Sequence, residues 1–234
     1  MIALYADTSN LVDIASLSAD SRIMGFTTNP SLMRKAGVTD YLSFIPKALA
    51  AARGKPISFE VVEGSADSIY RQARKLAMFG PTVYVKVPII QEDGTSLLPV
   101  IGELSAEGIH VNVTAVCTLT HIKTATEVLL RADAPSILSI FAGRIADTGV
   151  DPEAYIRAAS CYRCFGTKKV QILWASTREV FNVQQAGRAG ADIITVSPEL
   201  LKKYLEWTDR SLDRVSADTV AQFNRDALES SLFL

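Results

Sequence analysis

The sequence predicts an α/β protein consisting of a single-domain (β/α)8 TIM barrel with an additional C-terminal helix. Eight short apolar runs rich in β-branched residues follow one another at intervals of about 20–35 residues. A helical pattern comes after each run. The chain has 234 residues, of which 48% are hydrophobic, and no stretch rich in Gly, Ser or Pro divides it. These features favour eight βα units around one large core.

The predicted strands are the eight apolar runs themselves. In chain order they are Ile2–Asp7, Ile23–Asn29, Pro56–Glu63, Val83–Ile89, His110–Val116, Ile137–Gly143, Val170–Ser176 and Asp192–Ser197. An open, doubly wound sheet is the alternative architecture. The phosphate-binding Gly-x-Gly-x-x-Gly turn of that fold is missing after the first run, so the barrel is favoured.

Capping signals predict where several helices begin and end. Ser65 starts a helix that Gly80 closes. Asn29-Pro30, Asp151-Pro152 and Ser197-Pro198 each combine a capping residue with proline at the first helical position.

The last part of the chain is predicted to differ from the rest. Residues 1–207 would form the barrel, and residues 208–234 would add one helix near Ala217–Ser230 and the apolar end Leu232-Phe233-Leu234. Such an end needs cover, either from the same domain or from a neighbouring subunit.

Charge and cysteine content exclude several classes of function. The net charge of −1 provides no field that attracts nucleic acid or an anionic membrane. The sequence opens on no signal segment, and no apolar run approaches the about 20 residues of a membrane span, so a soluble cytoplasmic protein is expected. Cys161-Tyr-Arg-Cys164 has the spacing of redox or zinc sites, but a second pair is missing and Cys117 stands alone. We therefore expect no metal and no cofactor.

Lys86 is the most informative residue, because it occupies the middle of the apolar run Val83–Ile89. Burial in such a strand disfavours the ammonium form, and a neutral amine can attack a carbonyl to form a Schiff base. The structural alternative is a lysine whose stem packs while its ammonium reaches solvent, or one that forms an ion pair with Glu60.

Other polar residues gather where the predicted strands end, which is where barrel enzymes carry their active sites. They are Asp7, Thr27, Asn29, Glu60, Asn112, Thr114, Ser139, Arg144, Ser176 and Arg178. Each has a structural alternative: Asp7 and Asn29 could cap helices, and the arginines could be loop charges. Together, around a mid-strand lysine, they favour a Schiff-base site.

Several motifs resemble the transaldolase family of class I aldolases, in particular its branch of small transaldolases and fructose-6-phosphate aldolases. The matching stretches run in order along the chain: Asp7-Thr8-Ser9, Gly25–Leu32 with Thr-Thr-Asn-Pro-Ser, Val85-Lys86-Val87-Pro88, Asn112-Val113-Thr114, Ser139–Ile145 and Ala175–Arg178.

The resemblance implies a role for each candidate residue. Lys86 would form the Schiff base, Asp7 would be the acid/base, and Glu60 would act through a water held by Thr114. The three-carbon unit would be held by Asn29, Asn112 and Ser139, with Thr27 and Phe141 nearby. The substrate phosphate would be held by Arg144, Ser176 and Arg178. The reaction would transfer a dihydroxyacetone unit from a ketose phosphate to an aldose phosphate, without metal or cofactor.

Two alternatives stay open. Fructose-6-phosphate aldolases typically have glutamine and tyrosine where this chain has Glu60 and Phe141, so the resemblance favours transfer over cleavage to free dihydroxyacetone. A barrel that kept the fold but serves in binding or assembly is the alternative from another class. Small members of the family form rings, often decamers of two pentamers, which implies a homo-oligomer here.

Three features depart from the family pattern. Ile140 replaces a proline, and the segment Gln91–Val100 is unlike its counterparts. Trp174 replaces a small residue; on a face shared with Ser176 it would narrow the pocket or fill the barrel floor. The nature of the sugar, and phosphate against another anion such as sulfonate, therefore remain open.

Overall fold

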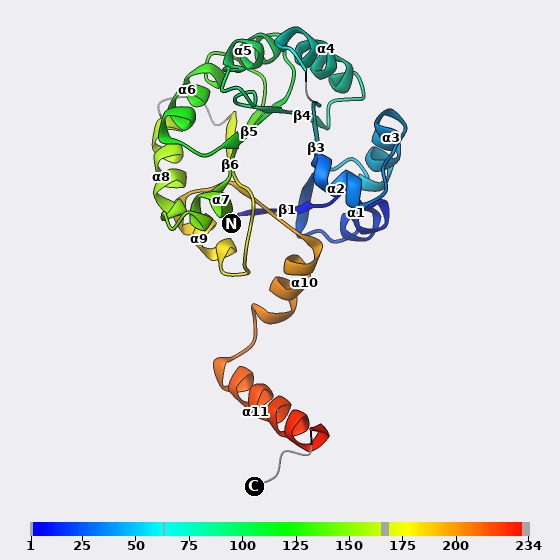
Figure 1. The fold of residues 1–234 in the computed structure, drawn as a ribbon, viewed down its shortest axis with the longest axis vertical. Helices are drawn as coiled ribbons and strands as arrows, with labels where there is room; N and C mark the ends of the chain where they lie inside the picture. Colours follow the sequence, from blue (N-terminus) through cyan, green and yellow to red (C-terminus); the bar gives the residue numbers. More distant parts are fainter. Residues whose placement is uncertain (1, 63, 165–168, 231–234) are drawn as a thin grey trace. The chain divides into compact units, whose positions relative to one another are not determined.

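The computed structural model describes residues 2–62, 64–164 and 169–230 (Figure 1). Eight parallel strands form a closed barrel in sequence order, and β1 pairs with β8 to close it. The strands are β1 Ala3–Asp7, β2 Ile23–Thr27, β3 Ile57–Glu60, β4 Val83–Pro88, β5 Val111–Val116, β6 Ser136–Ile140, β7 Val170–Trp174 and β8 Ile193–Val196. The predicted (β/α)8 barrel is confirmed.

Helices follow the strands and surround the barrel (Figure 1). They are α1 Leu11–Ser18, α2 Pro30–Lys35, α3 Tyr41–Ala52, α4 Ala66–Ala77, α5 Leu98–Ala106, α6 Leu119–Leu129, α7 Ala142–Asp147, α8 Pro152–Arg163 and α9 Asn182–Ala189. The predicted caps Asn29, Ser65 and Asp151 accept backbone N–H groups at the starts of α2, α4 and α8. Polar side chains thus satisfy helix donors that would otherwise lack partners.

An apolar layer fills the barrel interior below the polar strand ends. It consists of Tyr5, Ile137, Leu173, Ala175 and Ile193, with Tyr84 and Phe141 packed against it. Because side chains alternate along a strand, the inner face continues upward from this layer to the next residues of the same strands. Those residues, Asp7, Lys86, Ser139 and Thr195, are polar. The apolar layer therefore confines these polar side chains to one end of the barrel.

Six of the eight strands end one to three residues earlier than predicted, and the sixth and seventh are the ones that bear on the site. The sixth was predicted to reach Gly143, but β6 ends at Ile140 and α7 begins at Ala142. The seventh was predicted to reach Ser176, but β7 ends at Trp174, two residues before Ser176 leaves the extended region with a φ of 64°. For the third, Glu63 lies outside the described residues.

Trp174 does not narrow the pocket or fill the barrel floor, so that prediction was wrong. Its strand neighbours Leu173 and Ala175 belong to the interior layer, so alternation turns Trp174 outward, toward the helices. It is fully buried and stands in register with Ile140. Ile140 and Trp174, two of the three departures from the family pattern, are thus neighbours on the outer face of the sheet.

The chain divides into two compact units, residues 1–198 and 199–234. The division falls after the first residue of α10 (Pro198–Trp207), and the predicted boundary after residue 207 stays a prediction. In the second unit α11 spans Leu212–Glu229, starting earlier than the predicted Ala217 because Ser211 caps it. Leu232-Phe233-Leu234 lies outside the described residues. No helix in the described ranges has the length and apolar character to cross a membrane.

Candidate active site

Lys86 and Glu60 form an ion pair inside the barrel. They stand in register on β4 and β3, and 2.9 Å separate the Nζ of Lys86 from an Oε of Glu60. The ammonium also donates to the backbone carbonyl of Thr28, at 3.2 Å. Only 6% of Lys86 is exposed. The amine is thus held by two acceptors at the barrel mouth, and its stem does not escape to solvent.

Asp7 ends β1 beside a short chain of hydroxyl groups. The Oγ1 of Thr27 donates to an Oδ of Asp7 at 2.7 Å, and the Oγ1 atoms of Thr27 and Thr195 lie 2.5 Å apart. Because Thr27 gives its proton to the carboxylate, Thr195 is the donor in the second bond. The hydroxyls of two strands thus support one carboxylate.

The environment of Asp7 raises the pKa of its carboxyl group above the ordinary value. Burial is the main cause, and the negative charge of Glu60 adds to it. The positive charge of Lys86 and the bond from Thr27 oppose the shift without cancelling it. A carboxyl group with a raised pKa exchanges protons more readily near neutral pH, as acid/base catalysis requires.

A second hydrogen-bonded group lies on β3, β5 and β6. The amide of Asn112 donates to the Oγ of Ser58 at 3.0 Å and accepts from the Oγ of Ser139 at 2.6 Å. All three side chains are buried. Both ends of the amide are engaged, which fixes its orientation next to Lys86, its register neighbour on β4. A fixed amide and two hydroxyls can hold the hydroxyl groups of a sugar.

Thr114 stands at an irregularity of β5. Val113 pairs with Leu138 and Val116 with Ile140, so Thr114 and Ala115 together face one residue of β6. Ala115 has a φ of 59°, as expected of a bulge, and bulges often re-aim side chains near active sites. The buried Oγ1 of Thr114 has no hydrogen-bond partner among the described residues. A buried, unpaired hydroxyl is suited to binding a water or a substrate group.

Asn29 has the structural role that the sequence also allowed. Its Oδ1 accepts from the backbone N–H of Leu32 at 2.9 Å, which caps α2. The amide N–H₂ of Asn29 is not needed for this cap, so it can still donate to a substrate hydroxyl.

The two arginines lie on the other side of the barrel mouth, after β6 and β7. Arg178 donates from Nε and Nη2 to both oxygens of Asp147, at 3.0 and 2.5 Å. Arg178 and Arg144 both lower the pKa of the Asp147 carboxyl group, the hydrogen bond from Arg178 being the largest cause. The guanidinium of Arg144 also stacks over Phe141, 5.8 Å from the ring centroid. Arg178 thus pairs with the Asp147 carboxylate, and the charge of Arg144 acts on the same carboxylate; arginines of this kind also suit a phosphate.

A glycine allows the arginine-bearing segments to approach each other. A Cβ on Gly143 would lie 1.6 Å from the carbonyl oxygen of Ser176. Only glycine fits such a contact between α7 and the segment after β7.

Three contributors to this arrangement were missed by the sequence prediction. Ser58 and Thr195 lie inside predicted strands, on inner faces that alternation could have identified. Asp147 follows Arg144 by three residues on a helix, a spacing that signals proximity but not the pairing with Arg178.

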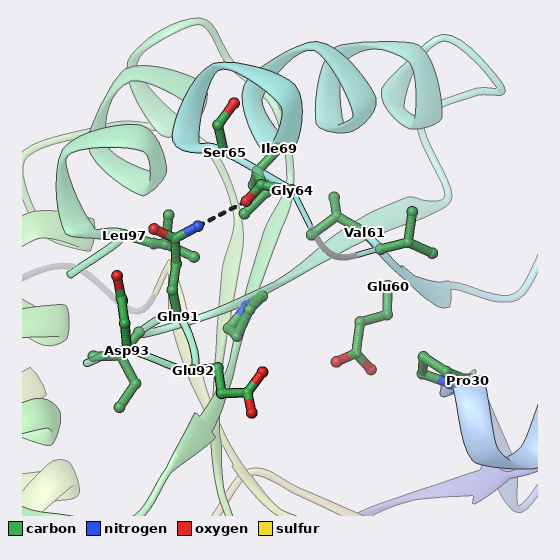
Figure 2. Close-up of a pocket in the computed structure, with 13 residues that line it drawn as sticks. Pro30, Glu60, Val61, Gly64, Ser65, Ile69, Gln91, Glu92, Asp93 and Leu97 are labelled. Atoms are coloured by element: carbon green, nitrogen blue, oxygen red, sulfur yellow. Dashed lines mark hydrogen bonds between the residues drawn. The ribbon is translucent and has the colours of Figure 1, made fainter. Parts of the chain in front are cut away.

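A pocket of about 860 Å³ borders Glu60 (Figure 2). Its walls come from the segments that follow β3 and β4 and from the start of α2. In Figure 2 the carboxylates of Glu60 and Glu92 point into it from opposite sides. The nucleophile candidate Lys86 therefore has a cavity of ligand size next to its partner.

The barrel mouth thus holds a buried amine, two carboxylates and two arginines, residue types that lysine-based carbon–carbon lyases and transferases use. Comparisons with known proteins agree with it. The sequence profile of the transaldolase/fructose-6-phosphate aldolase family matches residues 4–232.

The chain belongs to this family. A "Probable transaldolase" from Methanococcus maripaludis is 32% identical over 225 residues, which cover 94% of this chain and 99% of the relative. A "Probable transaldolase" from a Roseiflexus species is 36% identical over 219 residues, covering 92% and 95% of the two chains. Among solved structures, one described as native KDPGal has a TM-score of 0.53 at 16% identity and covers 97% of each chain, which shows the shared fold alone. The predicted resemblance is confirmed.

Proposed function

We propose that this transaldolase-family protein transfers a dihydroxyacetone unit from a ketose phosphate to an aldose phosphate through a Schiff base on Lys86. The observation that carries the proposal is the buried Lys86–Glu60 ion pair with its 2.9 Å contact. A buried amine next to a carboxylate can lose a proton to it and then attack the ketose carbonyl. Water leaves, and an iminium forms at Lys86.

Asp7 performs the carbon–carbon step. It accepts the proton of the C4 hydroxyl while the bond between C3 and C4 breaks, and the aldose phosphate leaves. The electron pair of the broken bond moves into the iminium, which becomes an enamine on Lys86. The enamine attacks the aldehyde of the acceptor, and Asp7 returns its proton to the new hydroxyl. Water then hydrolyses the iminium. The raised pKa of Asp7 supports this two-way role.

Glu60 and Thr114 serve the proton transfers at the Schiff base. Glu60 contacts the amine directly, and the unpaired hydroxyl of Thr114 is positioned to hold the water involved. Asn29, Asn112 and Ser139 hold the hydroxyls of the three-carbon unit, with Thr27 acting on Asp7. Arg144, Ser176 and Arg178 hold the phosphate; the positive charges of both arginines, which act on the same Asp147 carboxylate, support this.

Cleavage to free dihydroxyacetone is the second candidate activity. Two features favour transfer: the carboxylate of Glu60 and the ring of Phe141, which carries no hydroxyl. The adduct on Lys86 therefore has one proton donor fewer beside it and persists until an acceptor binds. The cytoplasmic location expected from the sequence stays a prediction.

We also propose that the chain forms a homo-oligomer through α11. Among the described residues, none in α11 is buried, and the apolar side chains of Val220 and Phe223 are 57% and 64% exposed. Exposed apolar side chains on one helix are typical of a surface that packs against a partner.

Borohydride trapping tests the Schiff base. Reduction in the presence of fructose 6-phosphate should leave a three-carbon adduct on Lys86, measured by intact-protein mass spectrometry and located by peptide mapping. Lys86→Arg should give no adduct, because guanidinium stays protonated and is a poor nucleophile. An adduct on a different lysine, or none with any ketose phosphate, would exclude the proposal.

Product analysis separates transfer from cleavage. Fructose 6-phosphate is supplied with and without erythrose 4-phosphate, and both glyceraldehyde 3-phosphate and free dihydroxyacetone are followed. Transfer requires fast release of glyceraldehyde 3-phosphate only when the acceptor is present. Equal rates with and without the acceptor would instead assign cleavage.

A further inference from the structure

The end of α8 carries two cysteines that the proposed reaction does not use. Cys161 lies in the last turn of the helix and Cys164 caps it. Both side chains are exposed, and both are free thiols. Among the described residues no His, Cys, Asp or Glu joins them in a group of three that could hold a metal ion, which leaves a pair of thiols at this place in the fold.

The backbone at the helix end brings the two side chains above each other. The N–H of Cys164 donates to the carbonyl of Cys161 at 3.1 Å, and to that of Ser160 at 3.2 Å. The first bond is of the 3₁₀ type, and the φ of −61° and ψ of −17° at Cys164 are close to 3₁₀ values. In a 3₁₀ turn the side chains at positions i and i+3 eclipse. The thiols therefore lie on one side of the turn.

The spacing of the two residues also suits a disulfide. Helical rise and radius place Cα atoms three positions apart at roughly 5 Å. Disulfides usually join residues whose Cα atoms are about 4.4–6.8 Å apart. Cys161 and Cys164 can thus be joined with only a small tightening of the last turn.

The residue between the cysteines fixes this turn to the barrel. The guanidinium of Arg163 forms an ion pair with Asp192 and donates to the carbonyl of Val170 at 3.4 Å. Asp192 in turn accepts the backbone N–H of Ile172 at 2.8 Å. The turn is therefore held against the starts of β7 and β8, at the end of the barrel opposite the candidate active site.

We propose that Cys161 and Cys164 are a redox-active dithiol, which small disulfides of the glutathione type convert into an intramolecular disulfide. The thiolate of one cysteine attacks a sulfur of the small disulfide, so that a mixed disulfide forms and one small thiol leaves. The thiolate of the other cysteine then attacks the protein sulfur of the mixed disulfide, and the second small thiol leaves. The two protons of the pair end on the released thiols, and its two electrons reduce the small disulfide. An exposed disulfide is readily reduced again, so the modification is reversible.

The test equilibrates the full chain with glutathione redox buffers. After acid quenching, unfolding and alkylation, intact-protein mass spectrometry counts the thiols. The chain has three cysteines, so the reduced protein should carry three labels. The oxidised protein should keep one label, on Cys117, because burial raises the pKa of that thiol and makes it less reactive. Peptide mapping should place the bond between Cys161 and Cys164.

The contribution of the fold is measured against the unfolded chain. The equilibrium constant for oxidation by glutathione disulfide should be about tenfold larger for the folded protein than for the protein in urea. For this two-electron couple the difference corresponds to a reduction potential about 30 mV lower.

Two variants serve as controls. Cys164→Ser leaves Cys161 without a partner thiol, so a mixed disulfide with glutathione should persist and appear as a glutathione adduct. Cys161→Ser combined with Tyr162→Cys keeps two thiols but spaces them at i and i+2, positions that do not face each other on a helix. This double variant should lose the tenfold difference between folded and unfolded protein.

Several results would overturn the proposal. They are glutathione adducts that persist on the unmodified chain, disulfides that join two chains, and three labels in the most oxidising buffer. Equal equilibrium constants for the folded and the unfolded protein would overturn it as well, because the fold would then not bring the thiols together.

Discussion

At the scale of single residues, the site depends on how burial sets the chemistry of Asp7. A hydrogen bond from one hydroxyl stabilises its ionised carboxylate, whereas burial and the negative charge of Glu60 destabilise it. Ionisation therefore costs more free energy here than in water. This cost is the physical basis of its proposed acid/base role, because a carboxyl group with an ordinary pKa would be a weaker base at neutral pH.

Asp7→Asn should lower kcat by about 10²–10⁴-fold, the usual contribution of general acid–base catalysis. KM should change little, because the amide keeps the size of the carboxylate and can still accept from Thr27. Steady-state kinetics with a ketose phosphate and an acceptor measure both constants. A kcat within threefold of the unmodified enzyme would remove Asp7 from the reaction.

The same substitution should change stability in a pH-dependent way. The pKa of Asp7 is higher in the folded than in the unfolded state. The free energy of unfolding therefore falls as pH rises from about 4, the pKa in the unfolded state, through the pKa in the folded state. Asp7→Asn removes this loss. Its free energy of unfolding relative to the unmodified chain should therefore increase from pH 3 to pH 7, measured by urea denaturation. A difference in free energy of unfolding that stays constant or falls as pH rises would contradict the raised pKa of Asp7.

Thr195 is expected to position Thr27 against Asp7. Thr195→Val removes the donor of the 2.5 Å bond, which weakens the support of the ionised carboxylate. The acidic limb of the pH profile of kcat should move to higher pH, and Thr195→Ser should restore it. A loss of stability without movement of the limb would show that Thr195 is merely structural.

At the scale of elements, the strands were predictable and their ends were not. Apolar runs and caps such as Ser65 locate each βα unit, because burial and helix starts are encoded locally. The ends of β6 and β7 depend on a contact between distant segments, the approach of Gly143 to Ser176, which no local pattern shows. Alternation predicts which polar residues face inward, including Ser58 and Thr195, but the pairing of Ser58 with Asn112 and of Thr195 with Thr27 is set only when the barrel closes.

Gly143→Ala should separate the two arginine-bearing segments. Its Cβ would lie 1.6 Å from the carbonyl oxygen of Ser176, so α7 or the segment after β7 must shift. We expect a rise in KM for phosphorylated sugars and a lower Tm, with a destabilisation of about 1–3 kcal/mol as for other overpacked sites.

Gly187→Ala is the control for this substitution. Gly187 lies in α9 with nothing within 4 Å of its added Cβ, so alanine should be neutral or stabilise the helix by up to about 1 kcal/mol. Equal Tm values for Gly143→Ala and the unmodified chain would argue against a required close contact.

At the scale of the whole molecule, the barrel accounts for the chemistry but not for the second unit. α11 has 18 residues and none of them is buried, although Leu212, Val220 and Phe223 recur at helical spacing. Most helices in proteins owe their stability to packing an apolar face rather than to intrinsic propensity. A second copy of the chain is the proposed source of that packing.

Phe223→Ser should therefore shift the assembly toward single chains. Phe223 is the largest exposed apolar side chain of α11, and aromatic residues contribute most where an interface is fully desolvated. Sedimentation velocity across a range of concentrations measures the change in mass, and Asn224→Ser, its polar chain neighbour, is the matched control. The unmodified chain should sediment as an oligomer, and Asn224→Ser with it. If the unmodified chain sediments with the mass of one chain at all concentrations, or if both variants dissociate equally, the apolar residues of α11 do not hold copies of this chain together.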